Sequence, residues 1–150
     1  MIYDWTYLGN PFLSPDSNHV GFVYCITDIS TNKKYIGKKK FWTTIKKPTL
    51  KGQKRARKIV KESDWVNYFG SSEKVKALVS DLGKENFRRE ILYFCETLGE
   101  MSYVEAYEQL SRNVLLSDEY YNEFVGCRIN GSHLNKVRDK ILASVGKFNK

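Results

Sequence analysis

The chain contains little cysteine and little histidine. Among its 150 residues there are only three cysteines and two histidines. Cys25, Cys95 and Cys127 are far apart, and together with His19 and His133 they do not have the spacing of zinc ligands. The sequence therefore gives no reason to expect a zinc site or a disulfide framework. The cysteines are predicted to be reduced thiols, as in cytosolic proteins.

Long hydrophobic runs are also missing. No stretch approaches the roughly 20 apolar residues that a membrane-spanning helix needs. The first residues do not have the basic-then-apolar order of a signal peptide. We therefore expect a cytoplasmic protein without a membrane partner. A length of 150 residues predicts a single domain, 1–150.

Acidic residues are outnumbered by basic ones. The chain has 25 lysines and arginines against 17 aspartates and glutamates, which gives a net charge of +8. Such a balance indicates a polyanionic partner, with nucleic acid as the first candidate and an acidic membrane surface as the second. There is no glycine-rich phosphate-binding loop.

Residues 21–37 have the pattern of a β-hairpin. Two short apolar and aromatic runs, 22–26 and 34–36, flank turn-forming residues at 28–33. The second run is followed at once by three lysines, 38–40. This arrangement places two tyrosines on neighbouring strands, close to a cluster of cations.

Alternation along the first strand assigns its side chains to two faces. Phe22, Tyr24 and Ile26 are expected on one face, and Val23 and Cys25 on the other. Taken alone, this pattern also fits an ordinary hairpin with aromatic cross-strand packing, since sheets use tyrosine freely.

The two strands carry the elements Phe22-Val23-Tyr24 and Tyr35-Ile36-Gly37. This pair resembles the signature of the GIY-YIG nuclease family, and the separation of its two tyrosines fits that family. The second element is intact. The first departs from the pattern, because phenylalanine and valine stand where glycine and isoleucine are usual.

Residues 38–63 contain 11 of the 25 lysines and arginines of the chain. Pro48 and Gly52 predict a loop, followed by a helix from about Gln53. The three-and-four spacing would place Lys54, Arg57, Lys58 and Lys61 on one face of that helix. Clustered like charges favour contact with phosphates, although a solvated basic face is the alternative. DNA contacts are predicted for Lys38, Lys39, Lys40, Lys54, Arg55, Lys58 and Lys61.

Three further elements are predicted downstream. Ser72 is a good N-cap for a helix that ends at Gly83. Residues 87–95 predict a third strand, although they also permit a helix. Ser102 and Glu105 have the spacing of a capping box, which predicts that the next helix begins there.

Short motifs in these elements extend the resemblance to about residue 130. They are similar to motifs of GIY-YIG proteins found in bacteriophages: Trp65-x-x-Tyr68-x-Gly70-Ser71-Ser72, Glu105-Ala106-x-x-Gln109, Asn113-Val114-Leu115 and Tyr120-Tyr121-Asn122. The resemblance implies an α/β (α+β) fold with a small, mainly antiparallel three-stranded sheet flanked by helices. The core would cover about 20–130, with a basic C-terminal helix or arm at about 131–150.

The resemblance also implies an activity, metal-dependent cleavage of phosphodiester bonds in DNA, in the host cytoplasm if the chain is phage-encoded. Carried over residue by residue, the family's site becomes Tyr24 as general base, Tyr35 in its hydrogen-bond network, Arg57 or Arg55 as phosphate clamp, Glu105 as ligand of Mg²⁺ or Mn²⁺, and Asn122 as a support of the site.

Two of these assignments carry conditions. A phenol titrates near 10, so Tyr24 needs cationic neighbours, such as Lys38, to lower its pKa. Glu105 could instead close the capping box with Ser102. Because the first motif lacks its glycine and isoleucine, a basic DNA-binding module that keeps the fold without efficient cleavage is the alternative function.

Overall fold

The computed structural model describes residues 4–144. Its strands are β1 (Trp5–Tyr7), β2 (Asn10–Pro11), β3 (Gly21–Asp28), β4 (Lys33–Lys40), β5 (Trp42–Lys47), β6 (Arg57–Glu62) and β7 (Phe87–Cys95). Its α-helices are α1 (Glu73–Leu82), α2 (Leu98–Ser111) and α3 (Arg138–Ser144). Short 3₁₀ turns are η1 (Trp65–Asn67), η2 (Lys84–Asn86) and η3 (Gly131–Leu134).

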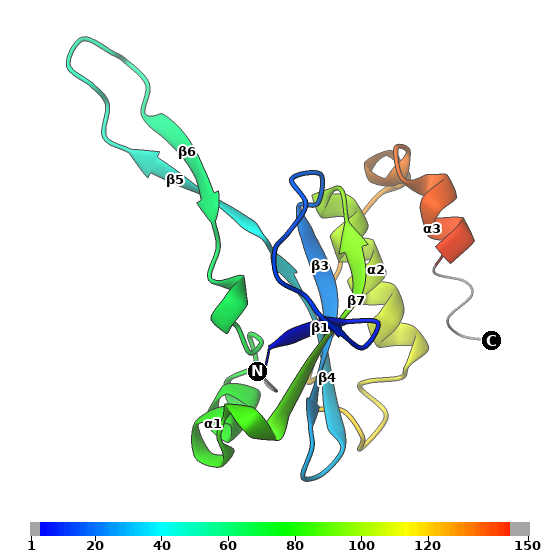
Figure 1. Cartoon of the computed structure of the whole chain (residues 1–150). Helices are drawn as coiled ribbons and strands as arrows, with labels where there is room; N and C mark the ends of the chain where they lie inside the picture. Colours follow the sequence, from blue (N-terminus) through cyan, green and yellow to red (C-terminus); the bar gives the residue numbers. More distant parts are fainter. Residues whose placement is uncertain (1–3, 145–150) are drawn as a thin grey trace.

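The centre of the molecule is a five-stranded sheet in the order β2-β1-β7-β3-β4 (Figure 1). Strand β3 pairs antiparallel with both β4 and β7, as the hairpin and the third strand predicted. The prediction of only three strands was wrong, because the N-terminal segment adds two more. Strand β1 pairs in parallel with β7, a contact between distant parts of the chain that local patterns do not reveal. The α+β class is confirmed.

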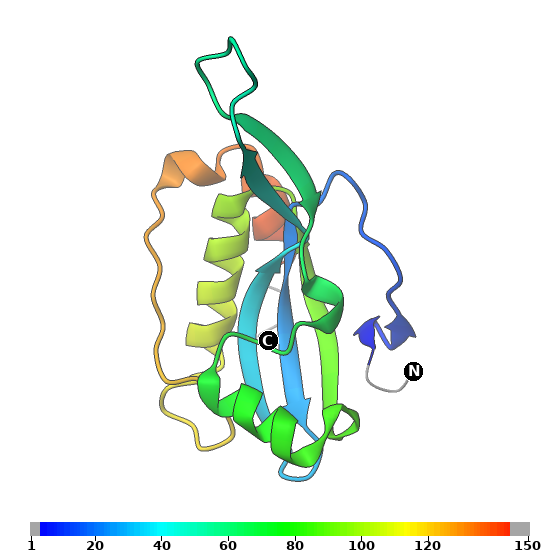
Figure 2. The same cartoon turned by 90° about the vertical axis from the view of Figure 1, so that its left-hand side faces the viewer.

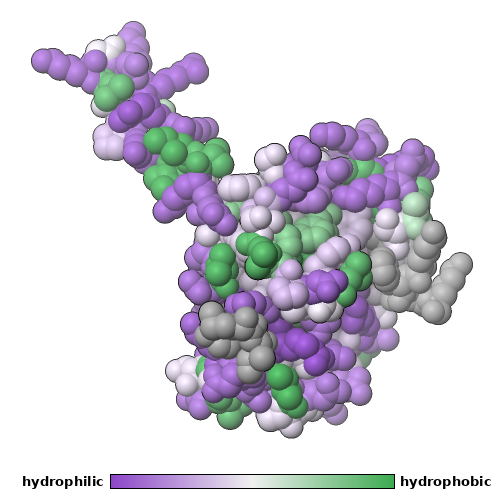
Figure 3. All heavy atoms as spheres, viewed as in Figure 1, coloured by the Kyte–Doolittle hydropathy of each residue, from purple (hydrophilic) through white to green (hydrophobic). Residues whose placement is uncertain are grey.

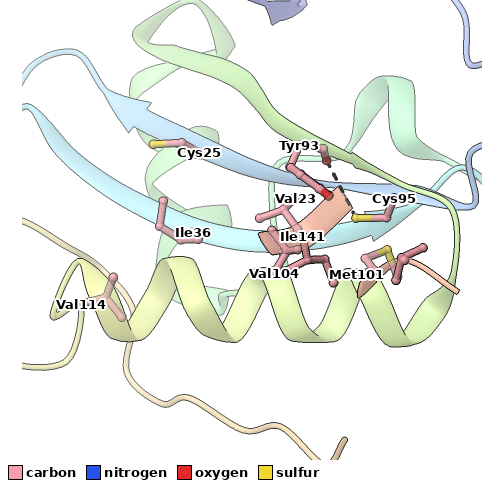
Figure 4. Packing of buried hydrophobic residues seen from close by; sticks show 10 residues of the cluster. Val23, Cys25, Ile36, Tyr93, Cys95, Met101, Val104, Val114 and Ile141 are labelled. Atoms are coloured by element: carbon pink, nitrogen blue, oxygen red, sulfur yellow. Dashed lines mark hydrogen bonds between the residues drawn. The ribbon is translucent and has the colours of Figure 1, made fainter. Parts of the chain in front are cut away.

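The two faces of the sheet carry different cores. All eight residues of β3 are buried, since neighbours cover both of its edges and both of its faces. Phe22 and Tyr24 join an aromatic cluster with Trp5, on the face that also receives side chains of α1. Val23 and Val104 belong to the opposite cluster, between the sheet and α2 (Figure 4). The predicted alternation is confirmed.

A bulge in β7 lets one strand supply both cores. Val23 lies opposite Tyr93, but the next residue, Tyr24, lies opposite Ile91. Leu92 is therefore the extra residue, which shifts the alternation of the strand by one position. As a result Ile91 packs in the aromatic cluster and Tyr93 packs on the side of α2.

Helix α1 begins and ends where the sequence predicted, whereas α2 does not. The Ser72 hydroxyl caps α1 by accepting a hydrogen bond from the backbone N–H of Val75 at 3.3 Å. Helix α2 begins at Leu98, with Thr97 as its N-cap. Ser102 and Glu105 therefore lie inside the helix, so the capping box that competed for the Glu105 side chain is wrong.

The predicted helix after Gln53 is also wrong. Residues 42–47 and 57–62 form a separate antiparallel ribbon that projects from the domain in both views (Figures 1 and 2). Cation spacing favoured a helix, but β-branched residues pair across the ribbon, with Thr44 opposite Val60 and Ile45 opposite Ile59. We call residues 42–62, the two strands and their connecting loop, the basic ribbon.

The C-terminal part of the chain packs against the sheet-and-α2 core. Val137 and Ile141 are buried in that core. The Lys140 ammonium lies 2.9 Å from the carboxylate of Glu100, which is fully buried. A helix in the predicted basic tail is thus present. Lys147 and Lys150 lie outside the described residues. Within the described part of the chain, no helix is both long and apolar enough to cross a membrane.

Asp28 closes the β3–β4 turn and ties it to the segment before Asn122. It accepts hydrogen bonds from Ser30, Asn86 and, at 2.8 Å, the Tyr121 hydroxyl. Burial opposes ionisation, but these hydrogen bonds prevail and lower the pKa of Asp28 to about 2.

We therefore expect the Asp28 carboxylate to stabilise the fold above pH 4 and to lose this effect as the pH falls from about 4 to about 2. The contribution is about 2 kcal/mol, because each unit of pKa difference corresponds to about 1.4 kcal/mol. Urea unfolding of the wild type and of Asp28→Asn between pH 2 and 7 would measure it. The exposed Asp118→Asn serves as control. A constant difference between wild type and Asp28→Asn across this range would contradict the assignment.

Candidate functional site

A pocket of about 330 Å³ opens beside β4, the edge strand of the sheet. Tyr35 reaches this pocket from the side of the aromatic cluster, and Glu105 reaches it from α2 on the other side of the sheet. We call it the edge pocket. It is lined by Tyr35, Ser71, Ser72, Glu73, Lys74, Glu105, Gln109, Asn122, Glu123, Phe124 and Gly126. Three predicted site residues, Tyr35, Glu105 and Asn122, thus meet here although they come from distant parts of the sequence.

Asn122 and Gln109 fix the position of β4 at this pocket. The Asn122 side chain accepts a hydrogen bond from the Ile36 N–H at 3.0 Å and donates one to the Ile36 carbonyl at 2.8 Å. The Gln109 amide donates to the same carbonyl at 3.0 Å. These contacts satisfy backbone groups that an edge strand would otherwise leave unpaired. Gln109 belongs to a motif visible in the sequence, but its partner there was not predictable.

Glu105 extends from α2 into the pocket, with 15% of its side chain exposed. Burial raises the pKa of this carboxyl above its ordinary value, although the Lys38 ammonium, 3.7 Å from Oε1, works in the opposite direction. Lys38 also donates a hydrogen bond to the Ser102 hydroxyl at 2.8 Å. Among the predicted DNA-binding lysines, Lys38 is the one beside this carboxylate.

Tyr35 presents its hydroxyl to the same pocket. Its oxygen lies 3.1 Å from the Ser71 hydroxyl, within hydrogen-bonding distance. Gly70 has φ +93°, and a β-carbon built on it would lie 3.5 Å from the Tyr35 ring. This left-handed conformation favours glycine and directs the chain into Ser71 and α1. Burial raises the pKa of Tyr35, and the hydrogen bond with Ser71 offsets only part of that increase.

Tyr24 lies behind Tyr35 and is completely buried. Its ring centre is 6.3 Å from that of Tyr35 and 5.9 Å from that of Tyr68. Within residues 4–144 its hydroxyl has no hydrogen-bond partner. Burial, followed by the neighbouring hydroxyls of Tyr68 and Tyr35, raises the pKa of Tyr24 well above its ordinary value. The expectation that cationic neighbours lower this pKa is wrong for the free protein.

The glycine of the second motif makes room for Tyr24. A β-carbon built on Gly37 would overlap the Tyr24 hydroxyl and the ring carbon that bears it. The two residues that depart from the first motif are packed in the two cores. Phe22 fills the aromatic cluster, with its ring centre 4.9 Å from that of Trp5, and Val23 is buried on the opposite face. Neither departure moves Tyr24 out of the position that Gly37 leaves open.

Arg89 holds the loop that covers Tyr24, a role that the sequence did not reveal. Its guanidinium donates hydrogen bonds to the carbonyls of Val66 and Tyr68, at 2.9 and 2.8 Å. It also lies over the Phe69 ring, 4.1 Å from its centre. Burial lowers the pKa of Arg89 to about 10, which leaves it charged at neutral pH. Tyr68 is thereby kept against the Tyr24 ring.

The basic ribbon carries Arg57 away from the edge pocket. Arg57 pairs with Lys47 in the last register position before the loop of the ribbon, and Arg55 lies in that loop. Neither arginine lines the edge pocket. The cations next to Tyr35 and Glu105 are instead Lys74, at the start of α1, and Lys38. We did not predict Lys74 as a site residue from the sequence. The feature that could have identified it is its position at the start of α1, two residues after the N-cap Ser72.

The pocket fits a weakly held divalent cation. No group of three His, Cys, Asp or Glu side chains with metal-binding geometry occurs within residues 4–144. Glu105 offers one partly desolvated carboxylate that faces an open pocket. A Mg²⁺ ion held by one carboxylate keeps several waters and takes further oxygen ligands from a phosphate. The residues present therefore suit an ion that is bound together with substrate.

Comparison with known proteins gives one match. The family model described as "Putative endonuclease segE, GIY-YIG domain" matches residues 5–125. That range includes β1, the hairpin, the basic ribbon, both long helices and Asn122. No curated protein and no solved structure matches the chain.

Proposed function

Since the chain belongs to the GIY-YIG endonuclease family, through a SegE-type domain that covers most of its length, we propose that the edge pocket is the centre at which it hydrolyses phosphodiester bonds in DNA. The observation that carries the proposal is the convergence of Tyr35, Glu105 and Asn122 on one pocket, with the unpartnered Tyr24 hydroxyl behind it. A buried polar atom without a partner is costly to keep, which favours a functional reason for it.

Tyr24 is our candidate for the group that accepts the proton of the attacking water. In the free protein its hydroxyl is neutral, because burial raises its pKa. A water molecule admitted beside it would meet an unused hydrogen-bonding group. Tyr35, whose hydroxyl is at the pocket, is placed to orient that water through the network that includes Ser71. Tyr68 would have to move aside to admit the water, since its ring packs against Tyr24.

Glu105 is our candidate for the metal ligand. When bound, a Mg²⁺ or Mn²⁺ ion supplies positive charge for the developing phosphate oxyanion and acidifies nearby water and hydroxyl groups. Lys38 is already 3.7 Å from the carboxylate and holds it in place in the free protein. Lys38 and Lys74 take the position of phosphate clamp that the family resemblance had assigned to Arg57. Asn122 supports the centre by fixing the Ile36 backbone.

Incubation of supercoiled plasmid with the protein tests the proposal. We expect nicked and linear products with Mg²⁺ or Mn²⁺, and none when EDTA removes the metal. DNA binding, measured by fluorescence anisotropy in EDTA, should persist, because lysines and arginines hold the DNA backbone. Binding without cleavage under every metal condition would favour the alternative, a DNA-binding module. Full cleavage in EDTA would contradict the metal dependence.

A further inference from the structure

The basic ribbon stands apart from the body of the domain. It forms its own two-stranded sheet, and every residue of β6 is exposed. Its side-chain anchors are at its base, where the Trp42 indole donates to the His19 carbonyl at 3.0 Å and the Trp65 indole donates to Glu62 at 2.6 Å. A two-stranded sheet alone is only marginally stable in water. The outer part of the ribbon is thus suited to a partner that covers it.

The charge of the ribbon identifies that partner as a polyanion. Lys46 lies directly opposite Lys58, and Lys47 lies opposite Arg57. Like charges in such positions destabilise a sheet unless counter-charges neutralise them. Hydrophilic side chains cover most of the projecting ribbon in Figure 3. Between residues 42 and 62 the only acid is Glu62, against the cations Lys46, Lys47, Lys51, Lys54, Arg55, Arg57, Lys58 and Lys61.

The two faces of the ribbon have different surroundings. Residues paired across an antiparallel ribbon share a face, so Lys47 and Arg57 lie on the same side as Ile45 and Lys61. Ile45 and Lys61 line a cleft of about 770 Å³ between the ribbon and the body, together with Lys38, Lys39 and Lys40. The opposite face carries Lys46 and Lys58, which do not line this cleft, and contributes only Trp42 and Glu62 to it, at the base of the ribbon.

The cleft leads toward the edge pocket. Lys38 lines the cleft. Its ammonium group is 3.7 Å from the carboxylate of Glu105, which lines the edge pocket. Lys39 lines the cleft as well and extends over the Tyr68 ring, 4.0 Å from its centre. A sugar-phosphate strand that follows these cations would therefore pass from the ribbon to the proposed catalytic centre.

We propose that the basic ribbon enters the major groove of duplex DNA with its cleft-facing side, and that the cleft guides one backbone past Lys38 to Glu105. The inference rests on the proposed function and extends it to the form of the substrate. A major groove about 12 Å wide admits a two-stranded ribbon, whereas an undeformed minor groove, about 6 Å wide, is too narrow for one. Duplex RNA is excluded by the same reasoning, because its major groove is deep and narrow.

The choice of groove is tested by binding to the full-length protein in EDTA, where no cleavage is expected. Methylation of guanine N7, which lies in the major groove, should weaken binding to a DNA duplex by about tenfold or more. A ligand that fills the minor groove should leave the affinity unchanged. Equal affinity for methylated and unmethylated duplexes, or for duplex RNA and duplex DNA, would overturn the proposal.

The choice of face is tested with two matched double variants that remove the same charge at adjacent register positions. Lys47→Gln with Arg57→Gln alters the cleft-facing side, and Lys46→Gln with Lys58→Gln alters the other side. The first should reduce the slope of log affinity against log salt by about 1.8, because each lost phosphate contact accounts for about 0.9. The second should change the slope much less. Equal slopes for the two double variants would mean that the ribbon has no preferred face and would overturn the proposal.

These tests separate the inference from the proposed function. Plasmid cleavage that persists while N7 methylation has no effect would leave the endonuclease assignment intact and remove the groove assignment. N7 interference in a protein that never cuts would support the ribbon's docking and remove the catalytic assignment. Circular dichroism of both double variants should match the wild type, since the altered side chains are exposed.

Discussion

Replacing Tyr24 by phenylalanine is expected to lower the rate of DNA cleavage by about 10²–10⁴-fold, the typical contribution of a general base, without destabilising the protein. The ring would keep its contacts with Tyr35, Tyr68 and Trp5. The lost hydroxyl is buried and unpartnered among the described residues, so its removal should leave the free energy of unfolding unchanged or raise it by about 1 kcal/mol. Single-turnover cleavage and urea unfolding would measure the two effects.

Tyr93→Phe provides the opposite pattern as a control. Tyr93 is on the α2 side of the sheet, and its hydroxyl donates to the buried Glu100 carboxylate at 2.9 Å. Its loss should destabilise the fold by about 1–3 kcal/mol and leave cleavage by the folded protein intact. A Tyr24→Phe enzyme with the wild-type rate would refute the role of Tyr24 and leave the tyrosine as a packing residue.

The dependence of the cleavage rate on pH provides a second test of the role of Tyr24. Because its pKa is raised in the free protein, the phenolate is a minor form throughout the neutral range, and its fraction grows about tenfold per pH unit. The wild-type rate should therefore rise with pH and show no plateau below about pH 10. Tyr24→Phe should lose this dependence. A rise of the same steepness in the variant would assign the titration to another group.

Replacing Glu105 by glutamine should abolish metal-dependent cleavage while it spares DNA affinity. Glutamine keeps the size of the side chain but removes the charge that a divalent cation requires. Stability should change little, because Lys38 keeps its hydrogen bond to Ser102 and remains partly exposed. The rate should fall by at least about 10²–10³-fold, the typical cost of removing one group that stabilises the charge of the transition state.

Glu123→Gln is the matched control, since Glu123 lines the same pocket but has no assigned role. It should cut plasmid nearly as well as the wild type. The decrease of the wild-type cleavage rate at acid pH should also reflect Glu105. Because the pKa of Glu105 is raised, its protonation begins to compete with metal binding at a higher pH than for an ordinary glutamate. Cleavage by Glu105→Gln at the wild-type rate would remove the metal assignment.

The parts of this structure that the sequence predicted are those specified by local patterns. The hairpin, the Ser72 cap of α1 and the third strand each depend on residues close together in the chain. The motifs also located Tyr35, Glu105 and Asn122, which the fold brings to one pocket. The predictions of secondary structure needed only the period of the hydrophobic pattern and the chemistry of caps and turns, whereas the three site residues came from the family resemblance.

The two failures that concern strands are cases of pairing at a distance. The segment 57–62 has the cation spacing of a helix, yet its β-branched residues pair with Thr44 and Ile45 across the loop 48–56. The pairing of β1 with β7 joins residues 5–7 to residues 89–91 in the same way. A pattern read along the chain contains no information on such partners, and for this reason Arg57 was expected on a helix and not on a strand of the ribbon.

The ion pair between Glu100 and Lys140 limits how far the chain can be truncated from its C-terminal side. Because the family match ends at residue 125, a truncated variant that ends there and lacks α3 would be a natural choice. Such a truncation would strip the ammonium from a carboxylate that has no access to water, and would take Val137 and Ile141 out of the core. Glu100 would keep its hydrogen bonds from Tyr93 and from the Glu96 N–H, but the loss of two buried aliphatic side chains alone costs about 3–6 kcal/mol, a large part of a domain's margin of stability. The smallest autonomous unit therefore extends beyond the homologous region, through α3.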